Sequence, residues 1–135
     1  MGSGPAPEAG VPGAADPAAA PFLALFARLN ARDAEGLAAL LDPEAVLLFP
    51  KAAPLLGPER ILRFFKLLWR GYPELRFTVQ EVILAPGGQR AALHWTNAGR
   101  TRAGAAYTNE GVTLLHLREG RIVGMSDFFK DTERF

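Results

Sequence analysis

The stretch YTNEGVTLLHLREGRIVGMSDFF, residues 107–129, contains two runs of alternating apolar and polar residues on either side of Arg118-Glu119-Gly120. Such alternation is typical of half-buried strands, and the short connection with glycine indicates a tight turn, so the stretch predicts a β-hairpin. The side chains of a strand point alternately to its two faces. Asp127 therefore shares a face with Met125 and Phe129, and a carboxylate on an otherwise apolar face calls for an explanation.

The same patterns continue along the chain and predict an α+β fold. Polar or Gly-containing connections at 85–88, 99–105 and 118–120 separate four long antiparallel strands within residues 75–131. Helical periodicity, with Pro21 in a first turn and Asp33 as an N-cap, predicts helices at 21–31, 34–41 and 58–70, and a short strand at 44–49. This order favours helices packed on one face of a curved sheet.

Length and composition favour one domain and exclude several classes of function. The chain has 135 residues, 49% of them hydrophobic, and its net charge of +1 steers it neither to nucleic acid nor to an anionic membrane. It has no apolar run of membrane-spanning length and no cysteine for disulfides or thiolate metal sites. Its two histidines are too few for a multi-histidine metal site. This profile fits a cytoplasmic protein.

The first 20 residues consist almost entirely of Gly, Pro and Ala. Such a composition buries little apolar surface, and it lacks the basic and apolar regions of a signal peptide. We therefore expect a disordered arm over residues 1–20 and a folded domain over residues 21–135.

Three segments in this order carry a family resemblance: ARDAEGLAALLDPEAVLLF at 31–49, GPERILRFFKLL at 57–68, and the hairpin at 107–129. Over residues 21–135 the chain resembles the SnoaL-like group of the nuclear transport factor 2-like superfamily. The resemblance implies a cone in which three N-terminal helices pack on a strongly bent mixed or antiparallel sheet and enclose one apolar pocket, often in a homodimer. The fold is shared by polyketide cyclases, ketosteroid isomerase, limonene epoxide hydrolase and non-catalytic binders, so function has to be argued from the site.

The resemblance places Asp127 inside the pocket, where SnoaL-like cyclases and epoxide hydrolases carry a catalytic aspartate. Apolar surroundings disfavour the charged form of a carboxyl group, so the pKa of Asp127 should be raised. Such a group can act as a general acid or base near neutral pH. The structural alternative is an Asp127 that faces solvent at a sheet edge or caps a loop amide.

The catalytic sets of two relatives are incomplete in this chain. The ketosteroid isomerase positions fall at Leu25, at Leu48 or Phe49, and at Thr113, so its donors and base are missing. The Arg-x-Asp pair of the epoxide hydrolases falls on Trp95-Thr96-Asn97, which has neither the cation nor the second proton acceptor. A SnoaL-like cyclisation or isomerisation needs only one acid/base carboxylate, and Asp127 fits that role.

Further residues are candidates for the pocket by alternation or by size. Asn97, Asn109 and Thr113 have the polarity to hold a carbonyl or enolate oxygen, although strand Asn and Thr more commonly satisfy nearby backbone or water. The two tryptophans favour a flat, apolar or aromatic ligand. The expected binding residues are Asn97, Trp95, Asn109, Thr113, Met125, Phe49, Trp69 and Phe129, with no metal ligand.

Apolar side chains are also expected on the outer face of the sheet, at Val112, Leu114 and Phe128, beside Thr96. An exposed apolar face indicates a partner, so we expect a symmetric homodimer through it. His94 and His116 fall on the same outer face by alternation. The leading hypothesis is a small-molecule acid/base enzyme without metal or organic cofactor. The alternatives are a non-catalytic binding domain for an apolar metabolite, an epoxide hydrolase-like enzyme, and a protein-binding role like that of the transport factor.

Overall fold

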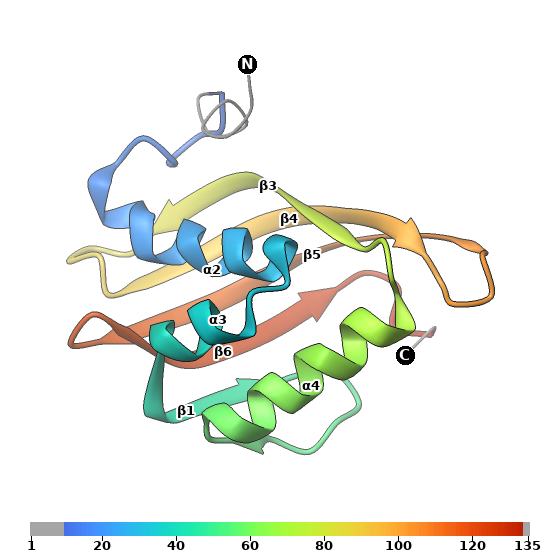
Figure 1. The fold of residues 1–135 in the computed structure, drawn as a ribbon. Helices are drawn as coiled ribbons and strands as arrows, with labels where there is room; N and C mark the ends of the chain where they lie inside the picture. The colour runs from blue at the N-terminus through green and yellow to red at the C-terminus, as the bar shows by residue number, and fades with distance from the viewer. Residues whose placement is uncertain (1–9, 134–135) are drawn as a thin grey trace.

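The computed structural model describes residues 10–133, and residues 1–9 and 134–135 lie outside this description. In chain order the elements are η1 (Pro17–Ala19), α2 (Ala20–Ala31), α3 (Ala34–Leu40), β1 (Leu41–Leu48), β2 (Leu55–Leu56), α4 (Pro58–Gly71), β3 (Arg76–Leu84), β4 (Arg90–Arg100), β5 (Ala106–Arg118) and β6 (Arg121–Phe129). The strands form one sheet in the order β2-β1-β6-β5-β4-β3, and α2, α3 and α4 cover one of its faces (Figure 1). The predicted α+β cone is confirmed.

The sheet is mixed because β1 joins it in parallel to β6, while strands β3 to β6 pair antiparallel in succession. The first strand begins earlier than predicted, at Leu41, directly after α3. Its register to β6 shifts between Leu41 and Val46, a segment that includes Pro43. Proline has no N–H to donate to a neighbouring strand, so it fits in β1 at this irregularity of the pairing.

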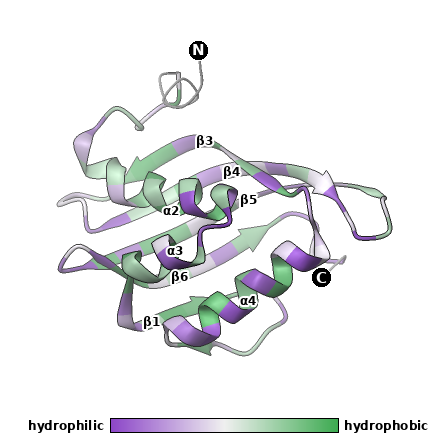
Figure 2. Cartoon of the chain, in the orientation of Figure 1, coloured by the Kyte–Doolittle hydropathy of each residue, from purple (hydrophilic) through white to green (hydrophobic). Residues whose placement is uncertain are grey.

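The helices begin where the sequence signals predict. The Asp33 side chain accepts a hydrogen bond of 2.9 Å from the Gly36 N–H and thereby caps α3. Hydrophilic and hydrophobic residues alternate along α4 (Figure 2), which buries Ile61 and Phe65 against the sheet. The Arg32 guanidinium, between α2 and α3, donates to the carbonyl oxygen of Trp69 at 3.0 Å, so the first two helices are fastened to the end of α4.

Residues 10–20 differ from the sequence-based prediction of a disordered arm. The Val82 N–H on the edge strand β3 donates to the Pro12 carbonyl oxygen at 2.9 Å, and Ala19 is fully buried. At Gly13 (φ 82°) a Cβ would lie only 1.9 Å from the Val82 oxygen, so glycine permits this approach. The prediction is based on how few large apolar side chains the segment has. In the structure a backbone hydrogen bond and small residues hold the segment against the open edge of the sheet, and composition does not reveal such contacts. The predicted disorder of residues 1–9 lies outside the described residues.

Within residues 10–133 no helix has both the length and the hydrophobicity that a membrane span requires.

Candidate active-site pocket

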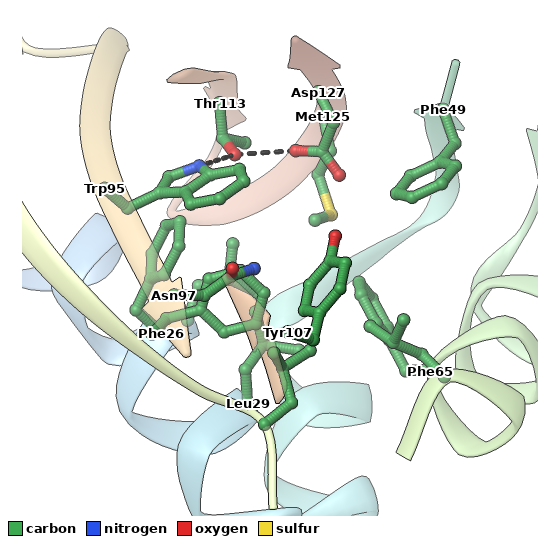
Figure 3. A pocket seen from close by; sticks show the side chains of 14 residues that line it. Phe26, Leu29, Phe49, Phe65, Trp95, Asn97, Tyr107, Thr113, Met125 and Asp127 are labelled. Carbon is green, nitrogen blue, oxygen red and sulfur yellow. Dashed lines mark hydrogen bonds between the residues drawn. The ribbon is translucent and has the colours of Figure 1, made fainter. Parts of the chain in front are cut away.

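A pocket lies between the helices and the concave face of the sheet, and Asp127 is part of its wall (Figure 3). The residues that line it are Leu25, Phe26, Leu29, Phe49, Phe65, Leu68, Leu75, Phe77, Trp95, Asn97, Tyr107, Thr113, Met125 and Asp127. Among these lining residues there is one carboxylate and no Lys, Arg or His. The free volume is about 30 Å³, room for only one or two water molecules.

A short chain of hydrogen bonds orients Asp127. The Trp95 indole Nε1–H donates to Thr113 Oγ1 at 2.8 Å, and the Thr113 hydroxyl donates to Asp127 Oδ1 at 2.6 Å. An indole N–H can only donate, so it occupies an acceptor site of Thr113 and leaves the single hydroxyl proton for the carboxylate. Thr113 and Asp127 are direct cross-strand partners on β5 and β6, so the register of the hairpin sets this contact.

Gly111 makes room for the indole of this chain. It is the cross-strand partner of Trp95, and a Cβ on it would lie 2.8 Å from the Trp95 ring and 2.3 Å from the Phe128 carbonyl oxygen. Both distances are shorter than van der Waals contact allows, so a side chain here would displace the ring or the neighbouring strand. The glycine therefore lets Trp95 reach Thr113.

The pKa of Asp127 is raised to about 6, chiefly because its carboxyl group is removed from water, while the hydrogen bond from Thr113 acts in the opposite direction. The direction predicted from the sequence is thus confirmed. No cation of the lining balances the charge. At neutral pH the group is mostly ionised yet close enough to its pKa to take up a proton readily.

A second polar area of the pocket is formed by Asn97 and Tyr107. Asn97 is only 7% exposed, and Figure 3 shows its amide pointing into the pocket. Tyr107 is buried, and its hydroxyl oxygen accepts a hydrogen bond of 2.8 Å from the Asn109 amide. Tyr107 is absent from the sequence-based prediction of the site, although alternation places it on the same face of β5 as Thr113, and that signal was sufficient to find it.

Residues 22–125 match the family model of the SnoaL-like domain. The chain belongs to the SnoaL-like family. The match ends two residues before Asp127, so it does not include this acid. A comparison with curated protein sequences gave no match.

Solved structures share the fold of this SnoaL-like domain. A candidate SnoaL-like polyketide cyclase from Jannaschia sp. CCS1 has a TM-score of 0.76 at 21% identity, covering 84% of this chain and 85% of that one. A candidate polyketide cyclase from Pseudomonas putida KT2440 has a TM-score of 0.73 at 20% identity, covering 84% and 91%. A Mycobacterium tuberculosis protein in complex with estradiol-17β-hemisuccinate has a TM-score of 0.75 at 20% identity, covering 84% and 94%. At these identities the likeness establishes the fold.

Six of the nine residues predicted for the site line the pocket of this SnoaL-like domain: Phe49, Trp95, Asn97, Thr113, Met125 and Asp127. The positions that correspond to the ketosteroid isomerase set also lie there, since Leu25, Phe49 and Thr113 are lining residues. Leu48, the other possibility for the first-strand position, is 46% exposed. What each residue does in binding or catalysis stays a prediction.

The other three predicted residues are not part of the lining. The Asn109 amide donates to the Tyr107 hydroxyl and to the Asp131 carbonyl, and its Oδ1 accepts from the Asp131 N–H, so it completes hydrogen bonds where β6 ends. Trp69 stacks on Phe65 with ring centroids 6.5 Å apart, and α4 presents Phe65 and Leu68 to the pocket instead.

Phe129 packs behind the pocket wall. Its ring centroid lies 5.3 Å from that of Phe49 and 6.3 Å from that of Trp95. The residue therefore supports two lining side chains without being one.

Within residues 10–133 no group of three or more His, Asp or Glu side chains lies close enough together to hold a metal ion.

Proposed function

We propose that this SnoaL-like domain is a small-molecule acid/base enzyme of the cyclase or isomerase type, acting on an apolar or aromatic carbonyl compound, with Asp127 as its acid and base. One observation carries the proposal: the Asp127 carboxyl group lies in an apolar pocket without a cation, its pKa is raised to about 6, and Thr113 fixes one of its oxygens. A carboxylate in this state is both basic enough to take a proton from carbon and acidic enough to return it.

The reaction begins with the ionised Asp127. Among residues 10–133 no hydrogen bond is made to Asp127 Oδ2, so this oxygen is available to the ligand. It removes a proton from a carbon next to a carbonyl group. The electron pair of that C–H bond forms a C=C bond, and the carbonyl π electrons move to oxygen as an enolate. In an isomerisation Asp127 returns the proton to another carbon. In a cyclisation the enolate carbon attacks a second carbonyl of the same molecule, and Asp127 protonates the resulting alkoxide.

The family and the fold are compatible with this chemistry, since candidate polyketide cyclases are among the neighbours in fold. The epoxide hydrolase alternative has less support. That reaction uses a cation and a second proton acceptor where this chain has Trp95 and Asn97, and the Trp95 N–H is already bonded to Thr113.

A non-catalytic binding domain is the second candidate function, and the free volume of about 30 Å³ bears on both candidates. Sites for organic ligands usually measure about 300–1,000 Å³. Any organic ligand therefore has to displace lining side chains, of which Met125 is unbranched and flexible. A site that opens only for its ligand serves binding and catalysis equally well, so activity has to decide between them.

The test uses 2-tetralone, a flat bicyclic ketone, in D₂O at neutral pD, with NMR to follow deuterium uptake at the carbon between ring and carbonyl. We expect the wild-type protein to accelerate the exchange above buffer and Asp127→Asn to remove about 10²–10⁴-fold of that acceleration, the usual contribution of a positioned general base. Glu110→Gln, which neutralises a carboxylate on the other face of the sheet, serves as the matched control and should retain the rate. A wild-type protein that binds 2-tetralone without accelerating exchange would support the binding domain instead.

A further inference from the structure

Asn97 has a buried side-chain amide without a protein partner. Its residue is 7% exposed, and its Oδ1 atom is fully enclosed without a hydrogen bond. Among residues 10–133 no hydrogen bond is made by its Nδ2 either. Buried polar groups in folded proteins are nearly always bonded, so an amide left in this state requires an explanation.

The cross-strand partner of Asn97 provides the contrast. Asn109 faces it directly across β4 and β5 and has the same side chain. Both ends of the Asn109 amide are bonded to the protein: the Nδ2 group donates to Tyr107 and Asp131, and the Oδ1 atom accepts from the Glu110 and Asp131 N–H groups. Asn109 therefore has a structural task, whereas Asn97 is directed into the pocket with its bonding capacity unused.

The apolar walls around Asn97 are consistent with a ligand rather than with bulk water. Phe77 is its cross-strand neighbour on β3, and Phe26, Phe77 and Trp95 line the same pocket. A polar group enclosed by aromatic rings discriminates between ligands, because a ligand without a matching polar atom leaves the amide unpaired. Because the enclosed Oδ1 atom can only accept and the lining contains no cation, the matching group on the ligand is a neutral donor such as a hydroxyl group, rather than a carboxylate or phosphate.

We infer that Asn97 is the specificity-determining residue of the pocket and binds a second oxygen of the substrate, remote from the carbonyl that reacts at Asp127. This inference rests on the proposed function. The register supports two separate polar ends: Asn97 pairs with Asn109 and Asp127 pairs with Thr113, four residues further along β5, or about 13 Å of strand. The bend of the sheet and the inward reach of both side chains shorten this span. The substrate class is a neutral, flat compound of two or more fused rings, with a ketone at one end and a hydroxyl group at the other.

The test compares 2-tetralone with 6-hydroxy-2-tetralone, which adds a neutral oxygen across the rings from the ketone. We expect wild-type protein to bind and exchange the hydroxylated probe about 5- to 10-fold better, the effect of one neutral hydrogen bond. Asn97→Leu, which replaces the amide by an apolar side chain of similar volume, should abolish this preference, so that the variant binds and exchanges the two probes equally well. Asn97→Ser, which keeps a polar group, should retain part of the preference and guards against a packing defect of the Leu variant.

Thermal unfolding supplies a readout that needs no ligand. Asn97→Leu should raise Tm, because it removes an unpaired buried amide, and Asn109→Leu should lower Tm, because it removes a fully bonded one. An equal loss for both probes in Asn97→Leu, or a lowered Tm, would overturn the inference. Binding of the two probes, measured by tryptophan fluorescence, keeps the tests separate: absence of exchange with any probe contradicts the proposed function, whereas binding without discrimination contradicts the role of Asn97.

Discussion

Two carboxylates on neighbouring strands, Glu110 and Asp127, point to opposite faces of the same sheet and meet opposite surroundings. On the outer face both oxygens of Glu110 are bonded to basic groups, at 2.9 Å from Lys130 Nζ and 2.6 Å from His94 Nε2, and the pKa of Glu110 is lowered by Lys130 and His94. On the inner face Asp127 has one neutral partner, Thr113, and its pKa is raised to about 6. The burial of Asp127 and its lack of a basic partner therefore indicate which of the two carboxylates is suited to chemistry.

The hollows on the two faces lead to the same conclusion. The outer groove, which includes Leu114 and His116, has a free volume of about 500 Å³, against about 30 Å³ for the inner pocket. The larger hollow is an open apolar surface, however, and none of its lining residues is an acid. Size alone would indicate a functional site on the outer face, whereas the carboxylate without a basic partner indicates a site on the inner face.

The largest effect expected from the contrast between the two acids is on stability, and its sign differs between them. The pKa of Asp127 in the folded protein, about 6, exceeds its usual value of 3.8, so the folded state binds a proton that the unfolded chain has already released between about pH 4 and 6. The stability contribution of Asp127 is therefore greatest below pH 4 and is lost as the pH rises through 6. Asp127→Asn should raise the free energy of unfolding at pH 7 by up to about 3 kcal/mol, and by little at pH 4.

Glu110→Gln should do the reverse. The lowered pKa of Glu110 means that its charge stabilises the fold above its usual pKa, so the variant should be less stable than wild type at pH 7, and the difference should vanish in acid. Urea unfolding of wild type and both variants at pH 4 and 7 measures how much each substitution changes the free energy of unfolding. If both substitutions changed it in the same direction at pH 7, the inner pocket would not hold a desolvated carboxylate.

The next effect is on self-association. We propose that a second copy of this chain covers the outer face of the sheet. Leu114 and Phe128 are 47% and 56% exposed there, as the alternation of β5 and β6 predicts. An apolar patch of this kind is unusual on a monomer. Leu114→Glu should therefore weaken self-association at least tenfold in sedimentation experiments without changing deuterium exchange at Asp127. Glu119→Leu, at the hairpin turn, is the control, and a monomeric wild-type protein at high micromolar concentration would refute the dimer.

The sequence predicts the framework well because its elements follow from local signals. The Asp33 cap, the prolines at the starts of α2 and α4 and the two-residue alternation of β5 and β6 each depend on neighbouring residues alone. The contact of Pro12 with Val82 could not be predicted, because it joins distant segments through backbone atoms and leaves no side-chain pattern.

The sequence predicts those features of the site that follow from the alternation of side chains along the strands. Alternation puts Asp127, Thr113 and Trp95 on the inner face, and the structure joins them in one hydrogen-bonded chain. The same alternation also predicts Asn109 for the pocket, but Asn109 is bonded to Tyr107 and Asp131 and does not line it. The face of a side chain is a property of the strand, whereas its bonding partners depend on tertiary contacts that the pattern does not contain.

The smallest expected effect tests the bond between Thr113 and Asp127. This hydrogen bond favours the ionised carboxylate, so Thr113→Val should raise the pKa of Asp127 further above its usual range. The midpoint of the pH profile of 2-tetralone exchange should move upward from about pH 6, and carboxyl-carbon NMR should show the same shift for Asp127.

Thr96→Val is the matched control for this shift. Thr96 lies on β4 next to Trp95 but on the outer face of the sheet, where its hydroxyl accepts from the Gln80 amide at 3.0 Å. Its loss should leave the midpoint unchanged. If Thr113→Val also left it unchanged, the hydrogen bond from Thr113 would not be lowering the pKa of Asp127. A downward shift would mean that the threonine hydroxyl accepts rather than donates, which requires Asp127 to be protonated in the resting protein, and the first proton transfer would then run from Asp127 to the ligand.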